Sequence, residues 1–193
     1  TNKDVTNYAR LNSREFAEEL KKRVREGSFL YQKPVVGCTD EEIEVFQATV
    51  TDKLPAVYVE FLKLVGKKVG NPTYERAFCL PYAQWRKRRA KEMIETSYLK
   101  KKIEDFVFDS NVLFFLLPKR KMSIFTVNRA PYKVKKGVYN ANPRVFTYTP
   151  EEGTFADSYL SSFILNGFNT GPEHDLPRWK YDEHADVGHF EEF

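Results

Sequence analysis

Three clusters of basic side chains lie in the middle of the sequence, at residues 86–91, 100–102 and 119–121. Their cations could bind phosphates or carboxylates. Interleaved cations and aromatic rings are typical of nucleic-acid contacts, because cations neutralise phosphates and rings stack on bases. The same cations could instead dock an acidic protein surface, which we favour over nucleic acid, or simply form a solvated helix face. The candidate partner-binding residues are Trp85, Arg86, Arg88, Arg89, Tyr98, Lys119, Arg120 and Lys121.

Few residues have the types and spacing that catalysis needs. The sequence contains no Gly-rich phosphate loop and no Gly-x-Ser-x-Gly turn. Its three histidines, His174, His184 and His189, lie near acidic residues at the end of the chain, but their spacing matches no zinc pattern. We therefore expect no catalytic residues, no metal and no cofactor, and a protein that is not an enzyme.

The charge is unevenly distributed along the chain. Residues 63–136 carry nineteen basic and six acidic side chains, a net charge of +13, whereas residues 173–193 have a net charge of −5. This complementarity predicts that the acidic tail, residues 173–193, folds back onto the basic middle. Exposed ion pairs contribute only about 0–1 kcal/mol each, so Trp179, Tyr181 and Phe190 would supply most of the docking energy.

Composition bounds the class of protein. The chain has 193 residues, of which 41% are hydrophobic and 15% aromatic, so a packed core is expected. Cys38 and Cys79 form no Cys-x-x-Cys pair and are expected to be free core thiols in a reducing compartment. No apolar run approaches the roughly 20 residues that span a bilayer, and no signal peptide is visible. We expect a cytoplasmic protein that does not enter membranes.

Helix signals dominate the first half of the chain. Asn12 with Glu15, and Thr39 with Glu42, are capping boxes that predict two helix starts. Pro55 is expected at the first position of a third helix, because its missing N–H is not needed there. One helix or two short ones are predicted between residues 82 and 104.

Strand signals follow. Short aromatic and β-branched segments predict strands at residues 105–108, 111–117, 122–127, 132–134, 138–139 and 144–148. Asp157 or Ser158 is expected to cap a last helix that ends at Gly167. This order predicts an α+β fold, a central antiparallel-rich sheet flanked by helices, in a single domain of residues 1–172.

The segment of residues 37–66 resembles the signature of the SUKH superfamily. That signature is an acidic helix start after Thr or Ser, then Leu-Pro-x-x-Tyr-x-x-Phe-Leu and a Gly-rich turn. The similarity spans about residues 36–168 and continues at Asn142-Pro143, where the family has Asp-Pro, and at residues 158–167. The residues that match the fold signature are Gly37, Leu54, Pro55, Tyr58, Phe61, Leu62 and Gly66.

This resemblance implies an α+β domain without an established catalytic centre. Most bacterial members are immunity proteins that bind and inhibit a toxin, often a nuclease, and fungal members regulate cell-wall synthesis. The expected function is therefore a non-catalytic protein-binding module that neutralises a toxin. The alternatives are a nucleic-acid-binding module that uses the basic middle, or a regulatory interaction scaffold. Because nuclease inhibitors tend to be acidic, contact could also fall on residues 40–44 or on the tail.

Overall fold

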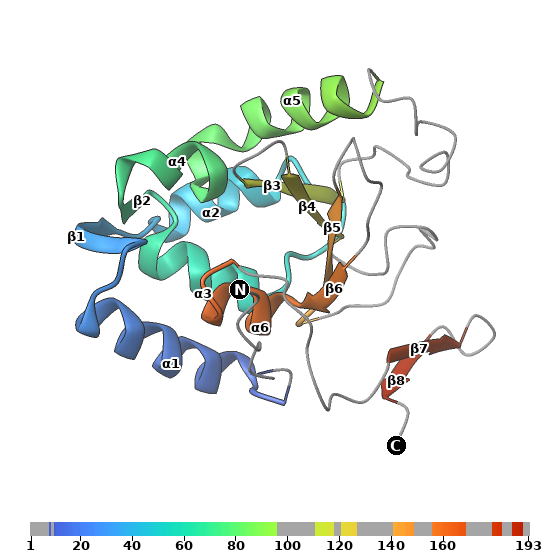
Figure 1. Cartoon of the computed structure of the whole chain (residues 1–193), viewed down its shortest axis with the longest axis horizontal. Coiled ribbons are helices and arrows are strands. Elements are labelled where there is room, and N and C mark those ends of the chain that lie inside the picture. Colours follow the sequence, from blue (N-terminus) through green and yellow to red (C-terminus); the bar gives the residue numbers. More distant parts are fainter. Residues whose placement is uncertain are drawn as a thin grey trace.

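The computed structural model describes Tyr8 and residues 10–95, 111–117, 121–126, 141–148, 156–168, 179–182 and 187–190. Helices dominate the N-terminal half and strands the rest (Figure 1). The helices are α1 (Ser13–Glu26), α2 (Asp40–Gln47), α3 (Ala56–Val65), α4 (Pro72–Phe78), the 3-10 turn η1 (Leu80–Tyr82), α5 (Ala83–Glu95) and α6 (Leu160–Leu165). The strands are β1 (Tyr31–Val36), β2 (Lys68–Gly70), β3 (Val112–Leu117), β4 (Lys121–Thr126), β5 (Arg144–Tyr148), β6 (Ala156–Tyr159), β7 (Trp179–Asp182) and β8 (Val187–Phe190). The α+β prediction is confirmed.

Helices α1 and α2 begin where the capping boxes predict. The Asn12 side chain accepts a hydrogen bond from the Glu15 N–H at 2.8 Å, and the Glu15 carboxylate accepts one from the Asn12 N–H at 3.2 Å. Thr39 and Glu42 repeat this exchange, with both distances at 3.2 Å. Each box satisfies N–H groups that a helix start otherwise leaves without partners.

Helix α3 begins one residue later than predicted. Pro55 is its N-cap, because its ψ of 136° belongs to extended backbone and not to a helix. The chain before it is held by Gln47, whose Oε1 accepts from the Leu54 N–H and whose Nε2 donates to the Asp52 carbonyl, both at 2.9 Å. A single side chain therefore orders the loop between α2 and α3.

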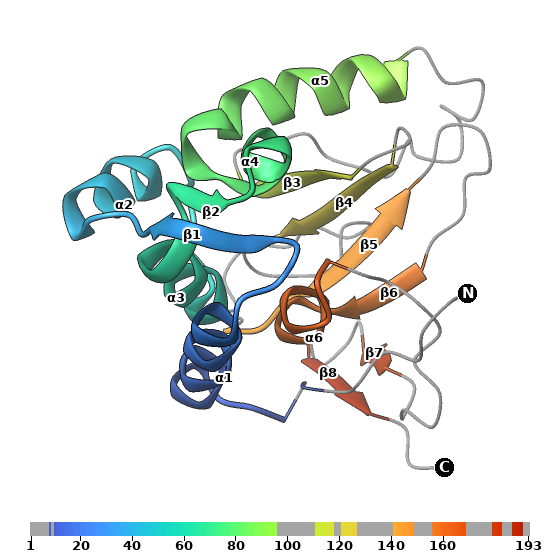
Figure 2. The ribbon, with the colours of Figure 1, turned by 60° about the vertical axis from the view of Figure 1, so that its left-hand side comes forward.

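The largest sheet has the antiparallel order β3-β4-β5-β6, and β1 with β2 and β7 with β8 form two-stranded sheets (Figure 2). Strand β5 has the predicted bounds, and β3 and β4 lie within one residue of theirs. The strands predicted at residues 105–108, 132–134 and 138–139 lie outside the described residues. Helix α4 and strand β1 have no counterpart among the predicted elements, because both are short and lack a clear apolar period.

Helix α6 corrects the prediction for its start. Tyr159 is its N-cap, because Asp157 and Ser158 pair with β5 as part of strand β6. Asn142 performs the capping from a distance in sequence. Its Oδ1 accepts from the Ser161 N–H at 3.0 Å, and its Nδ2 donates to Ser161 Oγ at 2.8 Å. An Asp at this position could not donate that second bond.

The predicted signature residues lie in the core. Leu54, Tyr58, Phe61 and Leu62 are each at most 2% exposed. Phe61 packs into an aromatic cluster, which consists of Tyr58, Phe61, Phe78, Phe115, Phe163 and Phe168.

The two signature glycines lie where the backbone leaves no room for a side chain. A Cβ on Gly37 would come within 1.7 Å of the Lys63 carbonyl oxygen. On Gly66 it would come within 2.8 Å of Cys38 Sγ. The sequence predicts turns at both glycines. The structure shows that each also needs a residue without a side chain, because another part of the chain passes close to its backbone.

The acidic tail contains a hairpin of β7 and β8, in which Trp179 pairs with Phe190. In both views this hairpin lies on the side of β6 and α6, away from α5 (Figures 1 and 2). It therefore does not cover the basic residues of α5, contrary to that part of the predicted fold-back. The other basic clusters lie in segments 96–110 and 118–140, of which the structure describes only β4. No described helix is long and apolar enough to cross a membrane.

Candidate functional site

Helix α5 carries four of the predicted partner-binding residues. Trp85 is 37% exposed, and the Arg76 guanidinium of α4 lies 5.8 Å from the centre of its ring. Such a cation–π contact contributes about 0.5–1 kcal/mol at an exposed site. A base or a partner side chain would have to displace Arg76 from that face of Trp85 before it could stack there.

Arg86 is the clearest correction to the predicted site. Its side chain is 1% exposed and cannot reach a partner. The guanidinium donates from Nε to the Phe114 carbonyl at 2.8 Å. From Nη1 it donates to the carbonyls of Cys79 at 2.6 Å and Arg76 at 3.1 Å. Two of these carbonyls end α4, where the negative end of the helix favours a cation, and the third lies on edge strand β3.

Burial sets the protonation behaviour around Arg86. Desolvation raises the pKa of Tyr58 to about 12, and the Arg86 charge opposes this only in part. Desolvation likewise lowers the pKa of Arg86, while the charge interaction and hydrogen bond with Tyr58 raise it. The pair is an internal polar link between α3 and α5, not a surface for recognition.

The other candidates divide between exposed positions and undescribed ones. Arg88 and Arg89 are exposed on α5, and Arg89 donates to Glu92 at 3.1 Å. Tyr98, Lys119 and Arg120 lie outside the described residues. Lys121 opens strand β4, where only the backbone is described. The structure therefore brings Trp85, Arg88 and Arg89 together on α5, and the predicted role of the remaining basic residues stays a prediction.

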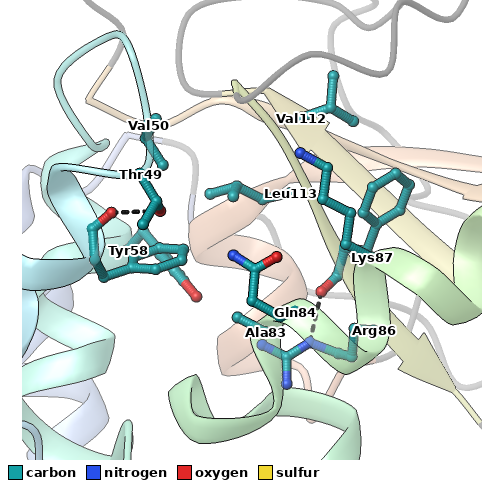
Figure 3. A pocket seen from close by; sticks show the side chains of 11 residues that line it. Thr49, Val50, Tyr58, Ala83, Gln84, Arg86, Lys87, Val112 and Leu113 are labelled. Carbon is teal, nitrogen blue, oxygen red and sulfur yellow. Dashed lines mark hydrogen bonds between the residues drawn. The ribbon is translucent and has the colours of Figure 1, made fainter.

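A small hollow of about 30 Å³ lies beside Tyr58 and Arg86. Thr49 and Val50, after α2, face Ala83 and Gln84 at the start of α5 across it (Figure 3). This hollow is too small for an organic ligand, since such sites usually enclose about 300–1,000 Å³.

A larger groove, with a volume of about 510 Å³, adjoins the hollow and shares Phe46, Thr49, Ala83 and Gln84 with it. It lies between α2 on one side and η1 with the first turn of α5 on the other. Val45, Leu80 and Pro81 give it an apolar lining, and Glu41 and Glu42 lie at its α2 side. Its size and mixed lining suit the side chains of a bound partner.

Val45 is the residue that sequence reasoning missed. Ile43 and Phe46 on the same helix are buried, whereas Val45 is 71% exposed and faces outward with Glu41. The available signal was its phase, because Val45 falls outside the apolar stripe that Ile43, Phe46 and Val50 form. A large apolar side chain on the polar face of a helix is informative when it borders a groove.

The α2 face is acidic. Residues 34–52 contain five acidic side chains and no Lys or Arg. Glu42 pairs with Lys67 at 2.9 Å, and this hydrogen bond is the main cause that lowers the pKa of Glu42. Within the described part of the chain no ion pair neutralises Asp40, Glu41 or Glu44. Of these three, Glu41 lines the groove, and Asp40 and Glu44 are exposed elsewhere on the same short helix, so the α2 side of the groove is negative.

The described ranges contain no group of three or more His, Cys, Asp or Glu side chains that could hold a metal ion. Burial raises the pKa of both Cys38 and Cys79 to about 11, and both thiols are free and buried, as predicted. Comparisons of the chain with family models, curated proteins and solved structures give no match.

Proposed function

We propose that this chain is a SUKH-type protein-binding domain that neutralises a toxin by binding it and covering its active site. The observation that carries this proposal is the α2 groove, which combines exposed Val45, an apolar lining from η1 and a carboxylate border. Apolar centres with polar rims are the usual anatomy of a protein-binding surface.

The buried signature supports the scaffold part of the proposal. Leu54, Tyr58, Phe61 and Leu62 all serve the core, and Gly37 and Gly66 serve close backbone contacts. Residues committed to packing are not available to a partner. Recognition then falls to surface features outside the matched side chains, and the α2 groove is such a feature.

The exposed surface of α5 supports protein binding over nucleic-acid binding. Arg86 is buried, Arg89 is paired with Glu92, and Lys91 lies 3.9 Å from Glu95. Burial of Arg86 removes one phosphate contact from this helix, and the two exposed pairs place carboxylates beside its remaining cations, which a phosphate would have to approach. The acidic α2 face would repel a nucleic acid that approached the groove.

The proposal is tested by capture followed by a growth assay. The chain serves as bait in the native lysate, and each captured protein is then expressed in a bacterial host, alone and together with the chain. We expect one captured protein to arrest growth alone and co-expression of the chain to restore growth. If no captured protein is toxic, or if the chain does not relieve the toxicity, the proposed function is wrong.

A further inference from the structure

The α2 groove has features that specify the chemistry of its occupant. Val45 on α2 and Leu80 and Pro81 on η1 form its apolar walls. The volume of about 510 Å³ is sufficient for one or two large apolar side chains. Such a groove is better suited to side chains on an exposed protein segment than to a flat apolar surface.

Charge restricts the occupant further. Glu41 lies four residues before Val45 and therefore on the same side of the helix. Glu44 does not line the groove, but it is exposed three residues after Glu41 and is therefore its neighbour on the helix surface. The described structure gives neither carboxylate an ion-pair partner. An acidic partner would be repelled here, whereas Lys or Arg side chains beside the apolar anchor would be attracted.

Three other large apolar side chains are exposed among the described residues: Val36 on β1 is 36% exposed, half as much as Val45, and the other two contact a neighbouring side chain. The ring of Phe29 packs edge-on against the ring of Tyr74, with the ring centres 5.6 Å apart, and the guanidinium of Arg76 lies over the ring of Trp85. Val45 is 71% exposed and borders the groove instead. The α2 groove is thus the described apolar surface best placed to accept a side chain from another molecule.

We propose that the groove binds a basic segment of the partner protein, which inserts an apolar side chain between Val45 and Leu80 and places Lys or Arg beside Glu41 and Glu44. This inference rests on the proposed function and specifies the site and the partner's chemistry. The carboxylates of Glu41 and Glu44 would pair with cations that the partner otherwise uses to bind an anionic substrate. Binding at the groove would therefore also inhibit the partner's activity.

The test uses three fluorescein-labelled peptides and the whole chain. The probe is Lys-Lys-Phe-Leu-Lys-Lys, and its controls are Glu-Glu-Phe-Leu-Glu-Glu and Lys-Lys-Ser-Ser-Lys-Lys. Fluorescence anisotropy measures affinity, and amide chemical shifts locate the bound peptide. We expect the probe to bind about tenfold or more tightly than either control, with shifts at Val45 and Leu80.

Substitutions on the groove provide the second arm. The Glu41→Lys, Glu44→Lys double variant should weaken probe binding about tenfold, and Val45→Ser about threefold or more. Glu18→Lys on α1 reverses an exposed charge elsewhere and should leave binding unchanged. All of these positions lie largely in solvent, so the variants are expected to fold, and circular dichroism checks this.

Several results would overturn the inference. Equal binding of the three peptides would do so, as would probe binding that survives the double variant. A dimer in sedimentation that Val45→Ser dissociates would assign the groove to a second copy of the chain. If a captured toxin binds the double variant as tightly as the unaltered chain, this inference fails and the proposed function stands. If the probe binds as expected but no toxin is captured, the proposed function fails alone.

Discussion

Replacement of Arg86 by Met tests whether this cation is part of the folded structure or part of a binding surface. Met has a similar length and fills much of the same space, but it donates no hydrogen bond. The substitution leaves the carbonyls of Phe114, Cys79 and Arg76 without the donors that now reach them at 2.6–3.1 Å. It also removes the positive charge that faces the C-terminal end of α4.

The magnitude follows from these contacts. A buried polar group that loses its partner costs about 1–3 kcal/mol, so three carbonyls set an upper range of about 3–9 kcal/mol. Part of this loss is offset, because a buried cation carries a desolvation cost of several kcal/mol that the substitution removes. We therefore expect Arg86→Met to lower the free energy of unfolding by about 3–5 kcal/mol.

Urea denaturation followed by circular dichroism measures this loss. With a slope of about 2 kcal/mol per M, the midpoint should fall by about 1.5–2.5 M. Arg88→Met, an exposed position on the same helix, is the matched control and should change the free energy by no more than about 0.5 kcal/mol. Arg86→Lys keeps the charge but not the planar fork, and should also destabilise the protein. If Arg86→Met lowered the free energy of unfolding by less than about 1 kcal/mol, the structural role would be refuted, and Arg86 would again be a candidate for the partner-binding surface.

Four further outcomes follow from the same structure. Phe61→Ala should lower the free energy of unfolding, measured by urea denaturation, by about 3–5 kcal/mol. A loss below about 1 kcal/mol would show that α3 is not part of the core. Gly37→Ala should destabilise the chain more than Gly167→Asn, because a Cβ on Gly37 meets backbone, whereas one on Gly167 meets open space and Asn tolerates the positive φ of 68° there better than most residues; equal midpoints would contradict this. The urea midpoint should fall between about pH 9 and pH 11, because burial raises the pKa of Cys38 and Cys79 to about 11 and the unfolded chain releases those protons first. A midpoint that is constant over this range, or native thiols that react at once with a disulfide reagent, would argue against that burial. Binding to generic DNA or RNA should be weak and should vanish near physiological salt; tight binding there would favour the nucleic-acid alternative.

Local signals in the sequence determined much of the helical framework. The capping boxes at Asn12 and Thr39 predict the starts of α1 and α2 correctly, because both partners lie within four residues of each other. The apolar spacing of Tyr58, Phe61 and Leu62 predicts the buried face of α3 for the same reason. Signals of this kind need no information about distant parts of the chain.

The cap of α6 could not be predicted from local sequence signals, because its partner is distant along the chain. The sequence places a cap for α6 at Asp157 or Ser158, but these residues are committed to β6, and Asn142 supplies the cap instead. The partner that satisfies the helix lies nineteen residues from Ser161 in sequence. Only the pairing of β5 with β6 brings the two together.

The candidate site shows the same limit. Arg86 belongs to a run of four basic residues, and nothing in that run separates it from exposed Arg88 and Arg89. Its burial depends on the end of α4 and the edge of β3, two elements whose carbonyls need a donor at that point. Val45 similarly borders a groove only because η1 lies opposite α2 in the folded chain. The sequence by itself determined which segments become helices and which residues carry charge, since these depend on near neighbours. Tertiary structure decided which charges are buried and which apolar side chains face a partner, because burial depends on segments that are remote along the chain.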